Sequence, residues 1–254
     1  MTPFSQAIQS VPCRRSRAVV WFAFFAMLPL EFCGCSGLTA KARNAQGVRL
    51  YQQARLYEAL QQFQEATYAN PTDADGYYNL AATYHRLGLL ENRQTDLDQA
   101  ENCYNLCLDR EANHREGHRG LAVLLAEQDR QQEAFRLLEG WADHSPGSAD
   151  AKIELARLFQ EFNDQQAAKQ HLIEAVAIDS TNPRALAALG KIREETGEQV
   201  AALADYQRSY AHDPFQPHLA VRIAALQSQM GPAASTIVPG SNTRLVRRAS
   251  ATLR

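Results

Sequence analysis

Two cysteines and two histidines near the middle of the chain have the types and the spacing that could bind a metal ion. They form the pattern Cys103-x3-Cys107-x6-His114-x3-His118, and thiolate and imidazole are ligands that zinc prefers. The six residues between Cys107 and His114 are fewer than a zinc finger has between its ligand pairs. Cys103 and Cys107, one helical turn apart, also diverge from disulfide geometry. The alternative is that all four side chains have structural roles.

A catalytic site would need a nucleophile, a base and an orienting group in one cleft. The remaining histidines have no Ser, Cys or carboxylate partner at a meaningful spacing, and we interpret them as surface residues: His85, His144, His171, His212 and His218. The sequence has no phosphate-binding glycine loop and no paired-carboxylate motif. We therefore expect a protein that is not an enzyme, with no catalytic residue, no metal and no cofactor.

The N-terminal segment has the layout of an export signal. Residues 1–17 hold three arginines and precede an uninterrupted apolar run over residues 18–30, the order expected of a signal peptide. As a helix this run is about 20 Å long, too short for a hydrocarbon core of about 30 Å. Glu31 stops its extension.

The apolar run is followed by Cys33-Gly34-Cys35-Ser36, which resembles the lipobox of bacterial lipoproteins, where a small residue precedes the lipidated cysteine. The resemblance implies a signal peptide over residues 1–35 and lipidation of Cys35, with Cys33 as the alternative. It places the protein in the cell envelope, lipid-anchored and facing the periplasm, at the outer or the inner membrane. Ordinary secretion and an uncleaved signal anchor are the other two interpretations.

Charge is distributed unevenly along the chain. Seven of the 26 Lys and Arg residues, but only one of the 28 Asp and Glu residues, lie outside Ser36–Met230, so that stretch carries a formal charge of −8. A protein that neutralises phosphates needs the opposite sign. We therefore expect no nucleic acid among the partners of the main body.

A repeat of 34 residues organises the middle of the chain. Four alanines recur at that interval, and a fifth precedes them by 41 residues: Ala59, Ala100, Ala134, Ala168 and Ala202. Each is followed four residues later by a large side chain: Phe63, Tyr104, Leu138, Leu172 and Tyr206. Twelve residues upstream, four copies hold a small residue: Gly47, Ala122, Ala156 and Gly190. Small residues at this spacing allow two helices to cross closely.

This pattern resembles the tetratricopeptide repeat, and Gly76–Gly88 is close to the first-helix consensus of that family. The resemblance implies an all-α fold, a right-handed superhelical α-solenoid of about five helical hairpins. Their predicted bounds are 40–73, 74–114, 115–148, 149–182 and 183–216, after a short linker at 36–39. In this register Cys107 takes the place of Ala66 and Ala175, and His118 that of Tyr77, which favours core packing over metal binding.

Three further features complete the predicted organisation. Turn residues between the two helices of a hairpin are Gly88, Asn163 and Gly197. The second copy carries seven extra residues, which either lengthen both helices or form a polar loop. A capping helix is predicted over 217–230, opened by Pro217 and ended by a Gly-Pro pair. For residues 231–254, rich in Ser, Thr, Ala and Arg, we expect a disordered basic tail.

The family resemblance also implies where a partner binds, since the first helix of each hairpin lines the inner groove. The predicted partner-binding residues are Asn44, Tyr51, Tyr78, His85, Arg86, Arg119, Ile153, Arg157 and Lys191. Their mixed charges suit a protein or peptide ligand better than a polyanion. The carboxylate clamp of some family members needs Lys and Asn where this chain has Asn44 and Val48, so that specificity is not supported.

We therefore expect a non-catalytic protein-interaction scaffold of the cell envelope, held at the membrane by its N-terminal lipid or signal anchor. Assembly of an envelope, secretion or pilus complex is the role that the resemblance suggests. The alternatives are an inner-membrane-anchored adaptor facing the cytoplasm and a repeat module of an enzyme complex.

Overall fold

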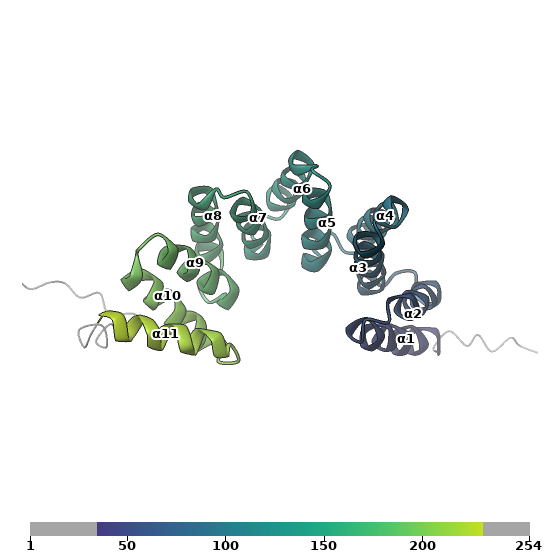
Figure 1. Cartoon of the computed structure of the whole chain (residues 1–254), viewed down its shortest axis with the longest axis horizontal. Coiled ribbons are helices and arrows are strands. Elements are labelled where there is room, and N and C mark those ends of the chain that lie inside the picture. Colours follow the sequence, from purple (N-terminus) through teal and green to yellow (C-terminus); the bar gives the residue numbers. More distant parts are fainter. Residues whose placement is uncertain (1–34, 231–254) are drawn as a thin grey trace, which may run out of the picture. The chain divides into compact units, whose positions relative to one another are not determined.

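The structure is a computed structural model that describes residues 35–230, in which every regular element is a helix. The predicted signal peptide, apart from Cys35, and the predicted basic tail lie outside these residues. The helices, shown in Figure 1, are α1 (Cys35–Gln52), α2 (Leu56–Ala69), α3 (Ala74–Glu91), α4 (Gln94–Arg110), α5 (Arg115–Glu127), α6 (Gln131–His144), α7 (Ala149–Glu161), α8 (Gln165–Ile178), α9 (Pro183–Glu195), α10 (Gln199–His212) and α11 (Pro217–Met230). The predicted all-α fold class is confirmed.

The helices pack in chain order as five hairpins, α1–α2 to α9–α10, and α11 packs against α10. Each hairpin also contacts the next one, so that the apolar face of one hairpin is buried by its neighbour, as in a solenoid. None of the helices in the described range is both long and apolar enough to cross a membrane. Helix α1 begins at Cys35, so residues 36–39, expected as a linker, are helical instead.

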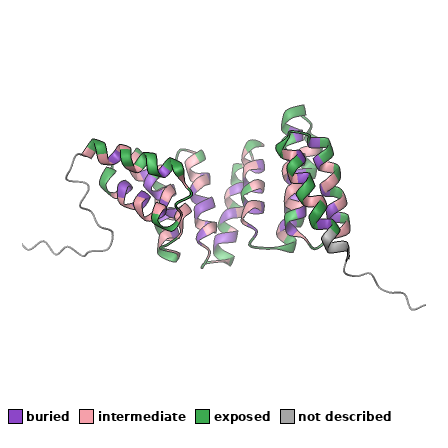
Figure 2. Ribbon diagram, turned by 90° about the horizontal axis from the view of Figure 1, so that it is seen from below, coloured by how far each residue is buried: buried purple, intermediate pink, exposed green. Residues whose placement is uncertain are grey.

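The repeated alanines are fully buried in the packing between helices. All five, from Ala59 to Ala202, have no exposed surface, and the large side chains four residues later are at most 3% exposed. Figure 2 shows buried positions along the whole row of helices. A Cβ atom added to Gly47 would lie 2.5 Å from Cε1 of Phe63, which real packing does not tolerate. The periodic core predicted from the 34-residue spacing is confirmed.

The turns inside the hairpins share one backbone conformation. One residue in each turn has a positive φ angle: Ala54, Asn92, Asp129, Asn163 and Gly197, with φ between 51° and 83°. This left-handed conformation ends a helix and favours Gly or Asn. The predicted turn residues Asn163 and Gly197 are confirmed.

The second hairpin differs from the others because its seven extra residues extend its helices. Helix α3 has 18 residues and α4 has 17, against 13 and 14 in the three hairpins that follow. The predicted turn at Gly88 is wrong: Gly88 lies inside α3, and an added Cβ would be 2.5 Å from Cδ2 of Leu97. The tight turn comes at Asn92 instead, and the alternative of a polar loop is excluded.

Candidate functional site

The first helices of successive hairpins form a continuous face, because α1 contacts α3, α3 contacts α5, α5 contacts α7 and α7 contacts α9. We call this the first-helix face. All the predicted partner-binding residues lie on these helices. Arg86, Arg119 and Lys191 are exposed, and Asn44, Tyr51, Tyr78 and Arg157 are half-buried.

Ile153 and His85 are corrections to the predicted set of partner-binding residues. Ile153 is only 6% exposed and belongs to a buried cluster with Ala149, Ala156 and Leu172. The residues that follow it in α7 are buried as well, so this stretch of the helix lies within the core. His85 is 8% exposed, so the expectation that it is a surface histidine without partners is also wrong.

His85 joins three helices through its imidazole ring. Its Nε2 atom lies 2.7 Å from Oε2 of Glu127 in α5, and its Nδ1 atom lies 3.5 Å from the hydroxyl oxygen of Tyr104 in α4. The Tyr104 ring meets the imidazole edge-on. Burial raises the pKa of Tyr104 far above its ordinary value, so this hydroxyl stays protonated and can donate to an acceptor. His85 therefore links α3 to α4 and α5 below the exposed surface of the first-helix face.

A cavity of about 230 Å³ opens between α1 and α3 at the N-terminal part of the first-helix face. Its lining is largely apolar and aromatic: Val48, Tyr51, Gln52, Phe63, Tyr78, Asn79 and Ala82. Asn79 donates a 3.0 Å hydrogen bond to Asn44 across the two helices, and the guanidinium of Arg86 lies 5.1 Å from the centre of the Tyr51 ring. The structure thus brings four of the predicted partner-binding residues, Asn44, Tyr51, Tyr78 and Arg86, to one place.

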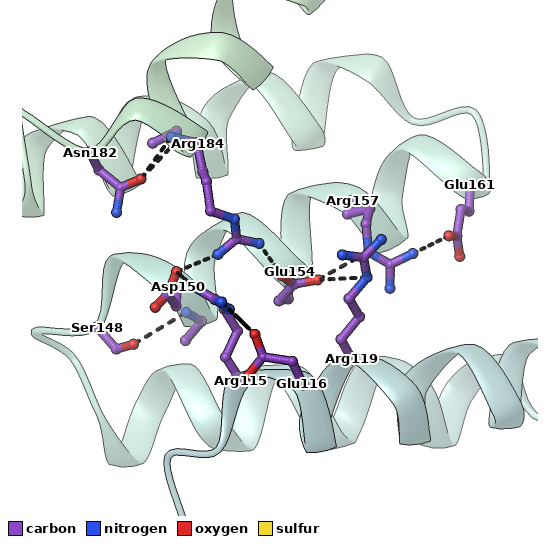
Figure 3. Close-up of polar contacts among 12 residues, drawn as sticks. Arg115, Glu116, Arg119, Ser148, Asp150, Glu154, Arg157, Glu161, Asn182 and Arg184 are labelled. Atoms are coloured by element: carbon purple, nitrogen blue, oxygen red, sulfur yellow. Dashed lines mark hydrogen bonds and ion pairs between the residues drawn. The ribbon is translucent and has the colours of Figure 1, made fainter. Parts of the chain in front are cut away.

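The central part of the face is built around Glu154, a carboxylate with no exposed surface (Figure 3). Its Oε1 atom accepts a 2.5 Å hydrogen bond from Arg184 in α9, and its Oε2 atom accepts a 3.0 Å hydrogen bond from Arg157 in α7. Arg119 in α5 lies 3.9 Å from the same Oε2 atom. Three arginines from three hairpins thus converge on one buried carboxylate, the arrangement that a buried charge requires.

Other acidic side chains balance these arginines. Asp150 accepts a 2.5 Å hydrogen bond from Arg184 and lies 3.7 Å from Arg115, which also pairs with Glu116. The Nη1 atom of Arg157 pairs with the carboxylate of Glu161. Arg119, about half exposed, donates no hydrogen bond to the described residues. The Nη2 atom of Arg157 is buried and has no hydrogen-bond partner among those residues.

A larger cavity, about 420 Å³, lies where α9 and α10 meet α11. Lys191, another predicted partner-binding residue, lines it together with Ala187, Ala188, Tyr206 and Leu219. Glu194 crosses this region, because it accepts a 2.7 Å hydrogen bond from Arg222 of α11 and a 3.1 Å hydrogen bond from the Tyr206 hydroxyl. The cavity has an apolar floor and a rim that carries both charges.

The Cys and His residues of the metal-like pattern have separate structural roles. Cys103 and Cys107 are buried and free, and burial raises the pKa of their thiols to about 11 and about 12. His114 caps α5 by accepting a hydrogen bond from the Gly117 backbone through Nδ1. His118 stacks on Trp141 with 4.2 Å between ring centres, and its Nε2 donates to the carbonyl of Ala112.

Comparison with known proteins identifies the repeats. Three tetratricopeptide-repeat family models match residues 47–88, 86–149 and 125–192, which together cover more than half of the chain. Comparison with curated proteins finds no matching sequence.

Many solved structures match the chain, and two of them share its fold over most of its length. The first is TTC0263, a thermophilic tetratricopeptide-repeat protein from Thermus thermophilus, with 24% identity, a TM-score of 0.54, and coverage of 74% of this chain and 98% of that one. The second is PilF of Pseudomonas aeruginosa, with 15% identity, a TM-score of 0.50, and coverage of 82% and 95%. With its repeating core, its five hairpins and these matches, the chain belongs to the tetratricopeptide-repeat family.

Proposed function

We propose that this protein is a non-catalytic scaffold of the cell envelope that binds a partner polypeptide along the first-helix face. The observation that carries the proposal is the make-up of that face. The first helices line two cavities of about 230 and 420 Å³, and exposed or half-buried Tyr, Arg and Lys side chains surround them. Tyr and Arg are, with Trp, the residue types enriched in protein-binding hot spots.

The envelope location rests on the sequence of the N-terminal segment, whose apolar run and lipobox-like end suit an exported, lipid-anchored protein. Such an anchor would keep the first-helix face close to a membrane and raise the effective concentration of a partner held at the same membrane. A role in assembling an envelope, secretion or pilus complex is the consequence that we propose.

Photo-cross-linking in cells tests the binding face. A photoreactive phenylalanine analogue is placed at Gln52 or Lys191, which line the two cavities and are exposed. Matched controls carry it at Gln132 or Glu139 of α6, exposed positions on a second helix. We expect a cross-linked partner polypeptide from the first pair only, in the membrane fraction. Equal cross-links from all four positions, or none from Gln52 and Lys191, would contradict the proposal.

A further inference from the structure

One side of helix α1 is exposed although the helix belongs to the packed array. Helix α1 packs on α2 and α3, and its positions Ala40, Gly47 and Leu50 are buried. The exposed side, which we call the α1 outer face, consists of Lys41, Ala42, Ala45, Gln46 and Arg49. These positions recur at helical spacing and therefore share one side of the helix. None of them lines the cavity between α1 and α3, so this face is distinct from the proposed partner-binding site.

The α1 outer face is basic, unlike the main body of the chain. Helix α1 holds three cations, Lys41, Arg43 and Arg49, and no Asp or Glu, whereas Ser36–Met230 as a whole carries a formal charge of −8. Arg43 lies outside the face and pairs with Glu65 of α2. Lys41 and Arg49 form no ion pair with the residues that the structure describes. The face thus presents two positive charges that the described protein does not neutralise.

The face also begins close to the predicted lipidation site. Helix α1 starts at Cys35, so that a helix rather than a linker joins this residue to the face. With a rise of about 1.5 Å per residue, Lys41 lies about 9 Å and Arg49 about 21 Å from Cys35 along the helix axis. A lipid on Cys35 would hold this end of α1 at the headgroups. Lys41 then stays within about one Debye length of the surface, where its attraction to anionic lipid is only partly screened.

We propose that the α1 outer face docks on a membrane surface that contains anionic phospholipids, with Lys41 and Arg49 at lipid phosphate groups and α1 lying along the surface. The inference rests on the lipid anchor in the proposed function and adds the contact that orients the first hairpin. Charge complementarity selects the occupant, because basic segments next to a membrane anchor are attracted to anionic lipid. Ala42 and Ala45 are small, so they do not hold the longer cationic side chains away from the surface.

Acrylamide quenching of tryptophan fluorescence tests this contact on the acylated protein reconstituted in vesicles. The reporter is Ala45→Trp, in the middle of the α1 outer face. The unaltered protein gives the background of its own tryptophans, of which Trp141 is only 4% exposed. Vesicles of phosphatidylcholine alone are compared with vesicles in which part of that lipid is replaced by phosphatidylglycerol. Acrylamide is uncharged, so the charge of the vesicle does not change its concentration at the surface.

We expect quenching of the Ala45→Trp reporter to be about twofold weaker on the anionic vesicles, with a difference that disappears at high salt. A lipid tether without docking predicts equal quenching on both kinds of vesicle. Lys41→Glu and Arg49→Glu, each combined with Ala45→Trp, should remove at least half of the difference.

Two controls use exposed positions on α6. Gln132→Trp should be quenched equally on both kinds of vesicle, and Arg136→Glu combined with Ala45→Trp should keep the full difference. Circular dichroism melts verify that each variant is folded.

Equal quenching of Ala45→Trp on the two kinds of vesicle would overturn the inference, as would a difference that survives both Lys41→Glu and Arg49→Glu. A difference that Arg136→Glu also abolishes would overturn it too, since net charge rather than this face would then be responsible. In all three cases the protein still floats with phosphatidylcholine vesicles. Loss of that flotation is instead a failure of the lipid anchor, and the inference fails with it. Cross-links from Gln52 and Lys191 test the partner-binding face independently of both.

Discussion

The carboxylate of Glu154 in α7 accepts a 2.5 Å hydrogen bond from Nη2 of Arg184, which belongs to the first helix of the next hairpin. Arg119 of the preceding hairpin lies 3.9 Å from the same carboxylate. One buried acid thus connects three consecutive hairpins. Because a solenoid is stabilised through contacts between neighbours, the loss of this charge affects the packing of all three.

We expect Glu154→Gln to lower the free energy of unfolding by about 3 kcal/mol, since removing one partner of a buried ion pair leaves uncompensated charge. The matched control is Glu161→Gln. Glu161 also pairs with Arg157, but it is 41% exposed, so its loss should cost no more than about 1 kcal/mol. Urea denaturation followed by circular dichroism measures both variants. Equal stability of the two would show that Glu154 contributes no more than a surface ion pair.

The hairpins could be predicted from the sequence, whereas the Glu154 cluster could not. The repeated alanines indicate the helix crossings because each acts locally, within one hairpin. Glu154 depends on Arg184, 30 residues later, and on Arg119, 35 residues earlier, and no local rule connects them. The available signal was an acidic residue directly before Leu155 and Ala156, where other repeats have Asn79, Gly120 or Ala188.

The predicted turn at Gly88 was wrong for a related physical reason. Glycine indicates either a helix end or a close helix contact, and only the packing of Leu97 against Gly88 decides between them. The partner-binding residues were predicted by position in the repeat. Burial by neighbouring helices, which removes Ile153 and most of His85 from the surface, depends on tertiary packing that position alone does not specify.

The turn residues Ala54 and Asp129 predict a gain in stability. Both have φ angles of 59°, a conformation that costs a residue with a Cβ atom about 1 kcal/mol relative to glycine. We therefore expect Ala54→Gly and Asp129→Gly each to raise the free energy of unfolding by up to about 1 kcal/mol. In contrast, Ala45→Gly, at an exposed position inside α1, should lower it by about 1 kcal/mol. Thermal melts that show a loss at all three positions would refute the argument.

The buried thiols of Cys103 and Cys107 predict a loss of stability at alkaline pH. Burial raises their pKa values from 9.0 to about 11 and about 12, so the unfolded chain releases these protons at a lower pH than the folded protein. Their contribution is therefore fully present below pH 9 and is lost as the pH rises toward 11 and 12. We expect about 1 kcal/mol less stability per thiol at pH 10 than at pH 8.

The comparison of wild type with a Cys103→Ala, Cys107→Ala double variant isolates the effect of the thiols from that of every other titrating group. Alanine fits at Cys107, since Ala66 and Ala175 occupy the equivalent buried positions. The double variant should lose less stability than wild type between pH 8 and pH 10 in urea denaturation. Identical pH dependence of the two proteins would mean that the thiols titrate normally in the folded state.

The lipobox-like sequence predicts acylation of Cys35, with Cys33 as the alternative. Residues 1–34 lie outside the described part of the structure, so this prediction rests on the sequence alone. Metabolic labelling with an alkyne fatty acid should mark wild type and should be abolished by Cys35→Ala, while Cys33→Ala keeps its label.

Cys103→Ala is the matched control, because its thiol is buried and a buried thiol with a raised pKa reacts poorly. Acyl chains hold a lipoprotein at the membrane, and more than one chain is needed for stable residence. The unlabelled variant, which has none, should therefore also leave the membrane fraction. Labelling that survives Cys35→Ala but not Cys33→Ala would move the processing site, and labelling of neither wild type nor variants would rule out a lipid anchor.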